Sequence, residues 1–390
     1  MIKHNESDFN DNENDFREND SESDSNETLD IDHNIALKNQ LRQWVSSHNI
    51  TRNFVNELLA MLHPRLPFLP LDCRTLMNTP RKTNIIKLNN NAIMSYFGIE
   101  GKLAAKLKHG LKNNVNVILL QINIDGLPLF KSSSTEIYPI LGLCNDLVDN
   151  TPFTIAVYCG SGKPDPIDIF LKDFITEAKK FKCDGLVFQN YRYDFDIHFF
   201  ICDTPARAYL RQTVGHTNKN SCEKCTIVGT YSNHRVNFAQ NTFRAYDAKL
   251  DSDFVEPVKP FYIKDNSPLL ELGIKLVAQF PLDPMHLIYL GVVKRLLVNY
   301  YFDGIAPFKL SQKIKQEIDI LVLIIRDYIT SDFARKCRSF KEIRRWKATV
   351  FRLFIMYTGP VLLFNAVNDS NYECFILLHC AIFILSNSDR

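Results

Sequence analysis

Residues 115–124, VNVILLQINI, end at Asp125 and Gly126, and this stretch decides the fold class of the chain. β-branched and other apolar side chains fill it, which favours a strand. Asp-Gly is a dipeptide typical of the turn that follows a strand. The sequence therefore predicts that a strand ends immediately before Asp125.

The segments that follow alternate between strand and helix patterns. Residues 137–143 and 153–159 are predicted strands, and residues 166–181 carry apolar side chains at the spacing of an amphipathic helix. A further predicted strand, residues 195–202, ends at Asp203, and a helix with proline in its first turn begins directly after it. This alternation predicts a mixed α/β sheet with flanking helices.

Composition and pattern divide the chain into four parts. Twelve carboxylates and only two basic residues occupy the first 32 positions, with few large apolar side chains, so residues 1–33 are predicted to be a disordered acidic leader. Residues 34–112 are predicted to form a small helical module and a linker, residues 113–283 the α/β core, and residues 284–390 a mainly helical region. The lysines of the second part fit a DNA- or partner-binding unit, and a solvated helix face explains them equally well.

Charge and composition also bear on location and partners. Outside the leader, 44 basic and 32 acidic residues remain, and this mildly basic balance permits a polyanionic partner without requiring one. The apolar runs 320–325 and 374–385 are too short to span a bilayer, and no apolar segment of the secretory type opens the chain. Ten cysteines without an export signal indicate reduced thiols in an intracellular compartment. We therefore expect neither a membrane protein nor a secreted one.

Residues 160–164, GSGKP, resemble a phosphate-binding loop, but the spacing is wrong. A Walker loop needs four residues between its glycines and a hydroxyl residue after the lysine. Here Pro164 follows Lys163 and has no hydroxyl for a metal ion. The sequence does not support ATP hydrolysis.

Two carboxylates, Asp125 and Asp203, directly follow predicted strands. On neighbouring strands of one sheet they would project into the crevice where α/β sheets usually bind ligands. Carboxylates suit Mg²⁺ or Mn²⁺, and two such ions can activate a water and stabilise the leaving oxygen of a phosphodiester. The alternative is that Asp125 opens a turn with Gly126 and Asp203 caps the following helix, because Asp is favoured in both roles. The sequence leaves both interpretations open.

Cys222 and Cys225 form the one close cysteine pair of the chain. A CxxC can bind Zn²⁺ through two thiolates, but a closed structural site needs four ligands. His216, His234 and His286 are the available partners, and none has the usual His-x₃₋₅-His spacing. The pair is therefore half of a zinc site, with an incidental pair as the alternative.

A series of short motifs occurs in a fixed order along the chain: DGLP (125–128), KSS (131–133), YPI (138–140), GSGKP (160–164), DTPAR (203–207), GH (215–216), CEKC (222–225), DPMH (283–286) and Gly291. This series resembles the catalytic domain of CACTA (En/Spm-type) DDE transposases, in the form found in animal genomes. The likeness continues through KAT (347–349) and YTGP (357–360). Each motif alone is unspecific, whereas the ordered series is specific.

The resemblance implies an RNase H-like fold in which three acidic residues hold two Mg²⁺ or Mn²⁺ ions. Asp125 matches the first acid and Asp203 the second. Related recombinases, the immune-receptor recombinase included, place a CxxC at a similar distance after the second acid, and Cys222 lies 19 residues beyond Asp203. In those relatives a later histidine pair completes the zinc site, and a glutamate beyond it supplies the third metal ligand.

The chain departs from that pattern after His286. His379 is the only later histidine, and no histidine pair followed by a glutamate occurs before Arg390. We therefore expect a chain truncated before the third acid, which does not cut DNA by itself, because a missing carboxylate weakens the charge stabilisation of phosphoryl transfer. Asp283 is an alternative third acid, although Asp-Pro-Met-His fits a helix start equally well, with Asp as cap and proline in the first position.

The resemblance thus implies a transposase-derived protein. Its ancestral reaction would be metal-dependent hydrolysis of a phosphodiester at an element end, followed by attack of the freed 3′-hydroxyl on target DNA. Lys131, Arg207, Lys224 and Arg235 are candidates for phosphate contacts, with solvated surface cations as the alternative. The implied partners are transposon ends and target DNA in the nucleus, and self-association stays open. The rival hypothesis is a non-catalytic relic that holds DNA or another protein.

Overall fold

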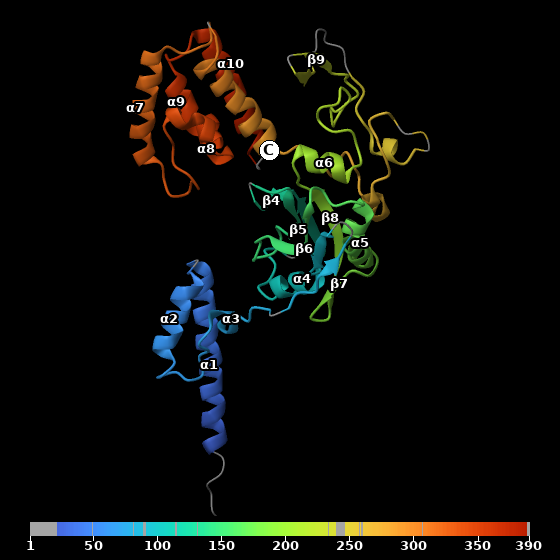
Figure 1. The fold of residues 1–390 in the computed structure, drawn as a ribbon, viewed down its shortest axis with the longest axis vertical. Helices are drawn as coiled ribbons and strands as arrows, with labels where there is room; N and C mark the ends of the chain where they lie inside the picture. The colour runs from blue at the N-terminus through green and yellow to red at the C-terminus, as the bar shows by residue number, and fades with distance from the viewer. Residues whose placement is uncertain are drawn as a thin grey trace, which may run out of the picture. The chain divides into compact units, whose positions relative to one another are not determined.

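The computed structural model describes residues 22–387 apart from short gaps, which are 49, 81, 89–90, 114, 131, 233, 239–245, 257, 259 and 306. The chain divides into two units, Met1–Thr83 and Asn84–Arg390 (Figure 1). Buried apolar residues gather in three separate clusters, one in the first unit and two in the second. Each cluster is a hydrophobic core of its own.

The first unit is helical. Its helices are α1 (Glu22–Ser47), α2 (Arg52–Leu62) and α3 (Cys73–Leu76). Val45 of α1 and Leu59 of α2 are almost fully buried, and they join the small core of this unit. Apolar side chains at helical spacing therefore form helices here, as the sequence pattern predicts.

The predicted acidic leader overlaps the first helix. Residues 22–33 belong to α1, whereas residues 1–21 lie outside the described residues. The disorder of the leader stays a prediction from its composition.

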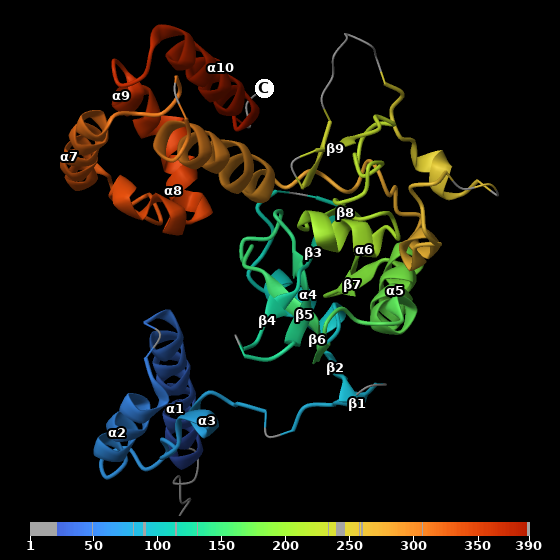
Figure 2. The same cartoon turned by 45° about the horizontal axis from the view of Figure 1, so that its top comes forward.

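The second unit is built on a mixed β-sheet (Figure 2). Its strands follow the order β1-β2-β6-β5-β3-β8-β7, and β4 pairs with β5 outside this path. β3 and β8 are parallel, and all the other pairs of this sheet are antiparallel. The strands are β1 (Ile86–Lys87), β2 (Ile93–Tyr96), β3 (Val117–Ile124), β4 (Leu127–Pro128), β5 (Thr135–Leu143), β6 (Phe153–Ser161), β7 (Leu186–Phe188) and β8 (Tyr191–Phe200).

The central strands confirm the mixed α/β class predicted from the sequence. β3 ends immediately before Asp125, as predicted, and alternate residues from Ile118 to Ile124 are fully buried. The strands predicted over 137–143 and 153–159 are β5 and β6. The strand predicted over 195–202 is the second half of β8, which ends at Phe200.

The sheet begins earlier in the chain than the predicted boundary at residue 113. β2 lies inside the predicted helical module, and it pairs with β6, a strand some sixty residues later, through Ile93 opposite Cys159. Four residues are too few to display a strand period, and the pairing is a long-range contact. The boundary between the two units accordingly falls after Thr83.

Helices flank the sheet. α5 (Ile167–Asp184) occupies the predicted helix, and it packs its apolar face against β6 and β8. The Glu177 carboxylate of α5 accepts hydrogen bonds from the backbone N–H groups of Ile99, at 2.8 Å, and Glu100, at 3.0 Å. These groups belong to the start of α4 (Glu100–Leu107), whose first N–H groups have no partner within the helix. One side chain therefore fixes α4 against α5.

Irregular structure connects the sheet to the C-terminal helices. After α6 (Thr204–Leu210) come a two-stranded hairpin, β9 (Thr230–Ser232) and β10 (Arg235–Asn237), and two short 3₁₀ helices, η2 (Asp251–Phe254) and η3 (Pro268–Leu272). Phe254, Leu269 and Leu272 are buried in the same core as the sheet. This segment therefore belongs to the sheet core.

Residues 285–385 form the predicted helical region, which has its own core. Its elements are the π-helical stretches η4 (Met285–Val293), η5 (Leu296–Phe302) and η7 (Phe354–Thr358), the 3₁₀ helix η6 (Phe340–Arg345), and the helices α7 (Gln312–Tyr328), α8 (Ala348–Leu353), α9 (Gly359–Leu363) and α10 (Asp369–Leu385). Tilted and edge-on aromatic rings, Phe340, Trp346 and Phe354 among them, fill its centre.

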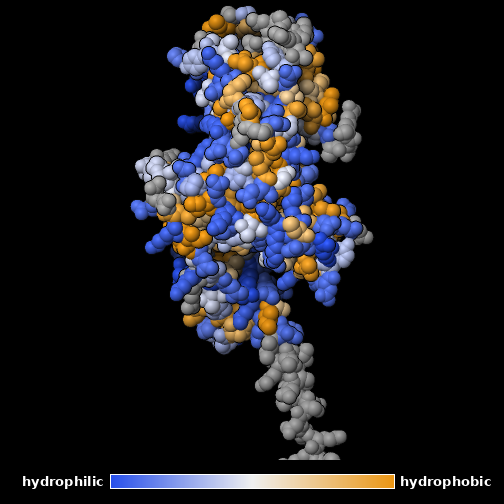
Figure 3. All heavy atoms as spheres, turned by 90° about the vertical axis from the view of Figure 1, so that its right-hand side faces the viewer, coloured by the Kyte–Doolittle hydropathy of each residue, from blue (hydrophilic) through white to orange (hydrophobic). Residues whose placement is uncertain are grey.

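None of the helices in the described ranges has an apolar stretch long enough to cross a bilayer. The face shown in Figure 3 mixes hydrophilic with hydrophobic side chains and presents no continuous apolar belt. Scattered exposed apolar residues are ordinary on protein surfaces.

Candidate functional site

Asp125 and Asp203 follow the carboxyl ends of two neighbouring parallel strands. Ile122 of β3 lies opposite Phe200 of β8. Beyond that pair the Ile201 backbone N–H donates to the Ile122 carbonyl at 2.7 Å, and Asn123 Nδ2 donates to the Ile201 carbonyl at 2.6 Å. The two strand ends are thus tied together, and both aspartates lie at the edge of the sheet where α/β proteins bind ligands.

The Asp125 carboxyl is half-buried and shares its surroundings with other ionisable groups. Burial is the largest cause that raises the pKa of Asp125, and the neighbouring charge of Asp203 is the next. The charge of Asp283 also raises this pKa, whereas the Gly126 backbone N–H and His286 lower it. Because screened charges act mainly over short distances, Asp125, Asp203 and Asp283 belong to one acidic neighbourhood.

Asp203 is also a helix cap. Its Oδ1 accepts a hydrogen bond from the Ala206 backbone N–H at 2.8 Å, at the start of α6. The structural role that the sequence left open for Asp203 is therefore confirmed. Its second oxygen, Oδ2, accepts no hydrogen bond from the described residues, so capping occupies only half of the carboxylate.

Asp283 has both oxygens engaged. Oδ1 accepts from the Met285 backbone N–H at 2.8 Å, and Oδ2 accepts from the His286 backbone N–H at 3.4 Å and also contacts His286 Nδ1. These contacts cap the start of η4, as the helix-start alternative predicts. The charge of Asp283 acts on Asp125, but the Asp283 oxygens are committed to this cap and to His286.

Two residues of the acidic neighbourhood could bind a divalent cation. Across the described ranges, no three His, Cys, Asp or Glu side chains lie in an arrangement that could bind a metal ion. Burial and then the neighbouring charge of Asp203 raise the pKa of Asp125, and a bound cation would offset both effects. Asp125 and the free oxygen of Asp203 are hard ligands suited to Mg²⁺ or Mn²⁺, with water or substrate oxygens completing the coordination.

Tyr138 of β5 closes one side of this neighbourhood. Its hydroxyl donates to Glu136 Oε2 at 2.8 Å. Burial and the hydrogen bond to Glu136 raise the pKa of Tyr138, and the charges of Asp125 and Asp203 raise it further. The tyrosine therefore stays protonated beside the two aspartates.

Gly126 allows the close approach of Tyr138. A Cβ atom at Gly126 would lie 2.6 Å from the Tyr138 hydroxyl oxygen, well inside van der Waals contact. We expect Gly126→Ala to cost about 1–3 kcal/mol of unfolding free energy, because the buried ring must move. Urea denaturation would measure this, with Gly101→Ala as control, because no atom lies within 4 Å of a Cβ there. Equal stability of the two variants would contradict the close packing.

The cysteine pair lies next to this site. Cys222 Sγ and Cys225 Sγ are 3.4 Å apart, and both thiols are free. Burial disfavours the Cys222 thiolate, but the backbone N–H groups of Lys224 and Cys225 outweigh it and lower the pKa of Cys222. Two thiolates bound to one tetrahedral zinc lie roughly 3.8 Å apart, so the pair is near that geometry. Within the described part of the chain, no histidine joins them to form a group of three ligands.

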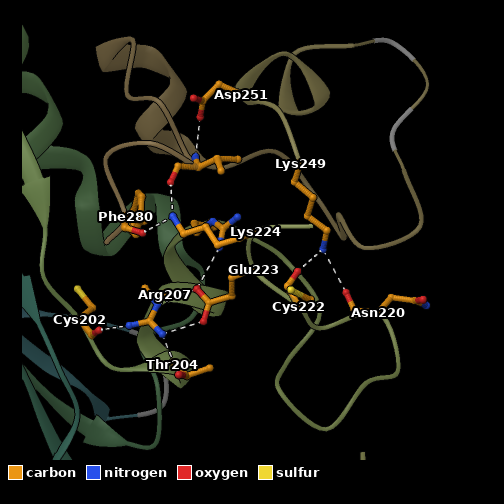
Figure 4. A network of polar contacts seen from close by, with 12 residues as sticks. Cys202, Thr204, Arg207, Asn220, Cys222, Glu223, Lys224, Lys249, Asp251 and Phe280 are labelled. Atoms are coloured by element: carbon orange, nitrogen blue, oxygen red, sulfur yellow. Dashed lines mark hydrogen bonds and ion pairs between the residues drawn. The ribbon is translucent and has the colours of Figure 1, made fainter. Parts of the chain in front are cut away.

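Glu223, between the cysteines, binds two buried arginines of the α6 segment, of which Figure 4 shows Arg207. Arg207 Nε and Nη2 donate to its two carboxylate oxygens, each at 2.7 Å, and Arg211 Nη1 donates to Oε2 at 3.2 Å. Arg207 Nη1 also donates to the Cys202 carbonyl at 2.6 Å. Burial opposes the charge of Arg207, but Glu223 outweighs it and raises the pKa of the guanidinium. The CEKC loop is thereby bound to the residue before Asp203.

Lys224 connects the same loop to the segment that leads to Asp283. Its Nζ donates to the carbonyls of Val277, at 2.7 Å, and Phe280, at 3.0 Å (Figure 4). On the other side of the loop, Lys249 Nζ donates to the Cys222 carbonyl at 2.6 Å. Residues 222–225 therefore join the two chain segments that carry Asp203 and Asp283.

These contacts correct two predicted phosphate contacts. Arg207 is buried, and its guanidinium donates to Glu223 and to the Cys202 carbonyl. Lys224 Nζ donates to two backbone carbonyls, so neither cation is available to DNA. The sequence pattern could not reveal this, because it does not indicate which cations meet buried acceptors. Arg235 is exposed on β10 and stays a candidate, while Lys131 lies outside the described residues.

Three residues that hold the site together were not predicted: Arg211, Glu223 and Lys249. Arg211 and Lys249 are buried although charged, and Glu223 is nearly so. Buried charges need partners to offset their lost hydration, and here the partners lie 12 to 29 residues away. The position of Glu223 inside CxxC is the one sequence feature that could have drawn attention to it.

No family model matches this sequence, and no curated protein matches it.

Proposed function

We propose that this chain derives from a cut-and-paste DNA transposase of the CACTA type, and that Asp125 and Asp203 hold a divalent metal ion. One observation carries the proposal: the two aspartates follow adjacent parallel strands at the ligand-binding edge of a mixed sheet. The motif order along the sequence supports the family, and the half-buried, electrostatically coupled carboxyl of Asp125 supports the metal.

In this proposal the chain's own residues prepare a site for a phosphodiester. Asp125 and Asp203 would hold Mg²⁺ or Mn²⁺, which supplies Lewis-acid activation of a phosphoryl oxygen or a water when bound. Tyr138 and Gly126 close one side of the pair, and the CEKC loop keeps the end of β8 in place. Cys222 and Cys225 would contribute two ligands to a structural zinc ion. The proposed partner is DNA, and the proposed location is the nucleus.

We expect this polypeptide to bind the metal without cutting DNA efficiently. The hydrogen bonds of Asp283 commit both of its oxygens to the start of η4 and to His286. Among the three described aspartates, that leaves Asp125 and one oxygen of Asp203 for a metal ion, where the related enzymes use three carboxylates. A missing ligand weakens positioning and charge stabilisation together.

The first test is metal binding. Calorimetric titration with Mn²⁺ is expected to give a site whose affinity falls about 10–100-fold or more in Asp125→Asn and in Asp203→Asn. Asparagine also caps helices, so Asp203→Asn spares α6. Asp168→Asn, an exposed acid on α5, is the control and should bind like the natural chain. Equal affinity in all four proteins would reject the proposed site.

Cleavage is tested separately, with supercoiled plasmid and Mn²⁺. We expect no nicking above background by the 390-residue chain. Robust Mn²⁺-dependent nicking that disappears in Asp125→Ala would show that the expectation of inactivity is wrong, while it would strengthen the assignment of Asp125.

A second candidate function is a non-catalytic protein that holds DNA or another protein. The caps made by Asp203 and Asp283 favour it, because both aspartates have structural roles that need no metal. Salt-dependent DNA binding without any Mn²⁺ site would select this alternative.

A further inference from the structure

A dense group of basic residues lies in the helical region, away from the acidic neighbourhood in sequence. Between residues 335 and 352 the only acid is Glu342, and all the basic side chains are exposed. They are Arg335, Lys336, Arg338, Lys341, Arg344, Arg345, Lys347 and Arg352. We call residues 335–352 the basic segment.

The core beneath the basic segment explains why its charges face outward. Every third residue, Cys337, Phe340, Ile343 and Trp346, is buried in the helical core. η6 has the three-residue repeat of a 3₁₀ helix. Because these four side chains are packed in the core, the residues between them are held at the surface.

Most of these cations lack an acidic partner. Lys341 pairs with Asp319 at 4.0 Å and Arg344 with Asp303 at 2.8 Å. The other six basic residues form no ion pair with any described carboxylate. The basic segment therefore keeps a net positive charge that is free to meet an anion.

A surface hollow of about 210 Å³ lies at this segment. Arg335 and Arg352 line it, together with Thr349 and the aromatic rings of Phe333 and Tyr357. Tyr357 is 51% exposed, and its ring meets that of Phe333 edge-on, with ring centroids 5.2 Å apart. One carboxylate, Asp332, also lines the hollow. Two arginines, a threonine and an exposed tyrosine thus line one hollow.

We propose that this hollow binds a nucleotide unit of single-stranded nucleic acid, with its phosphate on Arg335 and Arg352 and its base against Tyr357. Guanidinium groups match phosphate oxygens in geometry and charge, and unpaired bases stack on exposed aromatic rings. Bases inside a duplex are already stacked and cannot reach Tyr357. An acidic peptide would use the arginines, but it would leave the aromatic face without a role. We take the nucleic acid to be DNA, and this choice rests on the proposed function.

The test is fluorescence anisotropy of a labelled oligothymidylate with the full 390-residue chain in EDTA. Tyr357→Ala is expected to weaken binding about 5-fold or more, whereas Tyr357→Phe keeps the ring and binds like the natural chain. Arg335→Ala and Arg352→Ala should each lower the slope of log affinity against log salt by about 0.7. Asp332→Asn, which removes the opposing charge, should tighten binding. Lys313→Ala, an exposed cation on α7, is the matched control.

The outcomes separate this inference from its rivals. Weaker binding in Tyr357→Ala and a lower salt slope in both arginine variants, relative to Lys313→Ala, support it. Unchanged binding in Tyr357→Ala overturns it, as does a matching duplex that binds as tightly as the single strand. Equal competition by polyglutamate would assign the hollow to an acidic protein. Because EDTA removes divalent ions, a failed Mn²⁺ site leaves this result unaffected.

Discussion

Replacing Glu223 with glutamine is expected to lower the free energy of unfolding by about 3–5 kcal/mol, because it leaves two buried arginines without their counter-ion. The side chains of Arg207 and Arg211 are only 3% and 2% exposed, and Glu223 is their one carboxylate partner among the described residues. Burial already lowers the pKa of Arg211, and Glu223 counters that effect. Glutamine has nearly the same shape, so the loss would report charge rather than packing.

Chemical denaturation would measure this loss, and cysteine alkylation would locate it. Because Glu223 holds the CEKC loop against α6, Cys222 and Cys225 should react faster with iodoacetamide in Glu223→Gln. Glu271→Gln is the matched control, because Glu271 forms an exposed pair with Lys179 at 3.5 Å, and such pairs contribute at most about 1 kcal/mol. A cost for Glu223→Gln no larger than that of the control would mean that the arginines find other partners.

Phe354→Ala is expected to cost about 3–5 kcal/mol and to unfold the helical region first. The Phe354 ring is almost fully buried and contacts Phe340, Trp346 and Phe375, with ring centroids 5.7, 6.2 and 5.9 Å away. Its cluster shares no buried residue with the core of the sheet. Removing the ring should therefore weaken one core and spare the other.

Hydrogen exchange followed by mass spectrometry distinguishes the two cores. In Phe354→Ala, the amides of α8 and α10 should lose protection, while those of β3 keep theirs. Phe383→Ala, an exposed phenylalanine of α10, is the control and should change little. Equal loss of protection in β3 would show that the two clusters unfold as one cooperative unit.

Much of the sheet was predictable because its strands are long and apolar. β3, β5 and β6 each carry a run of apolar residues that reads as a strand without any tertiary information. The same local pattern placed Asp125 directly after a strand, and it placed Asp203 between a strand and a proline-initiated helix. β2 was missed because its four residues become a strand only by pairing with β6.

The surroundings of the aspartates show what the local sequence pattern cannot predict. The sequence offered a cap and a metal ligand as alternatives for Asp203, and the structure adds that a cap uses only one of its two oxygens. For Asp283 the cap and His286 use both. Hydrogen-bond directions of this kind depend on backbone N–H groups whose positions exist only after folding.

By itself, the sequence determined the mixed α/β class, the helical C-terminal region and the position of two aspartates at strand ends, because each depends on residues adjacent along the chain. Only the tertiary structure decided that β3 and β8 are parallel neighbours, which brings those aspartates together. It also decided that Arg207 and Lys224 face inward while Arg335 and Arg352 face solvent. The sequence shows each of the four only as a positively charged residue. The environment that neutralises or exposes each charge is assembled from residues far apart in the chain.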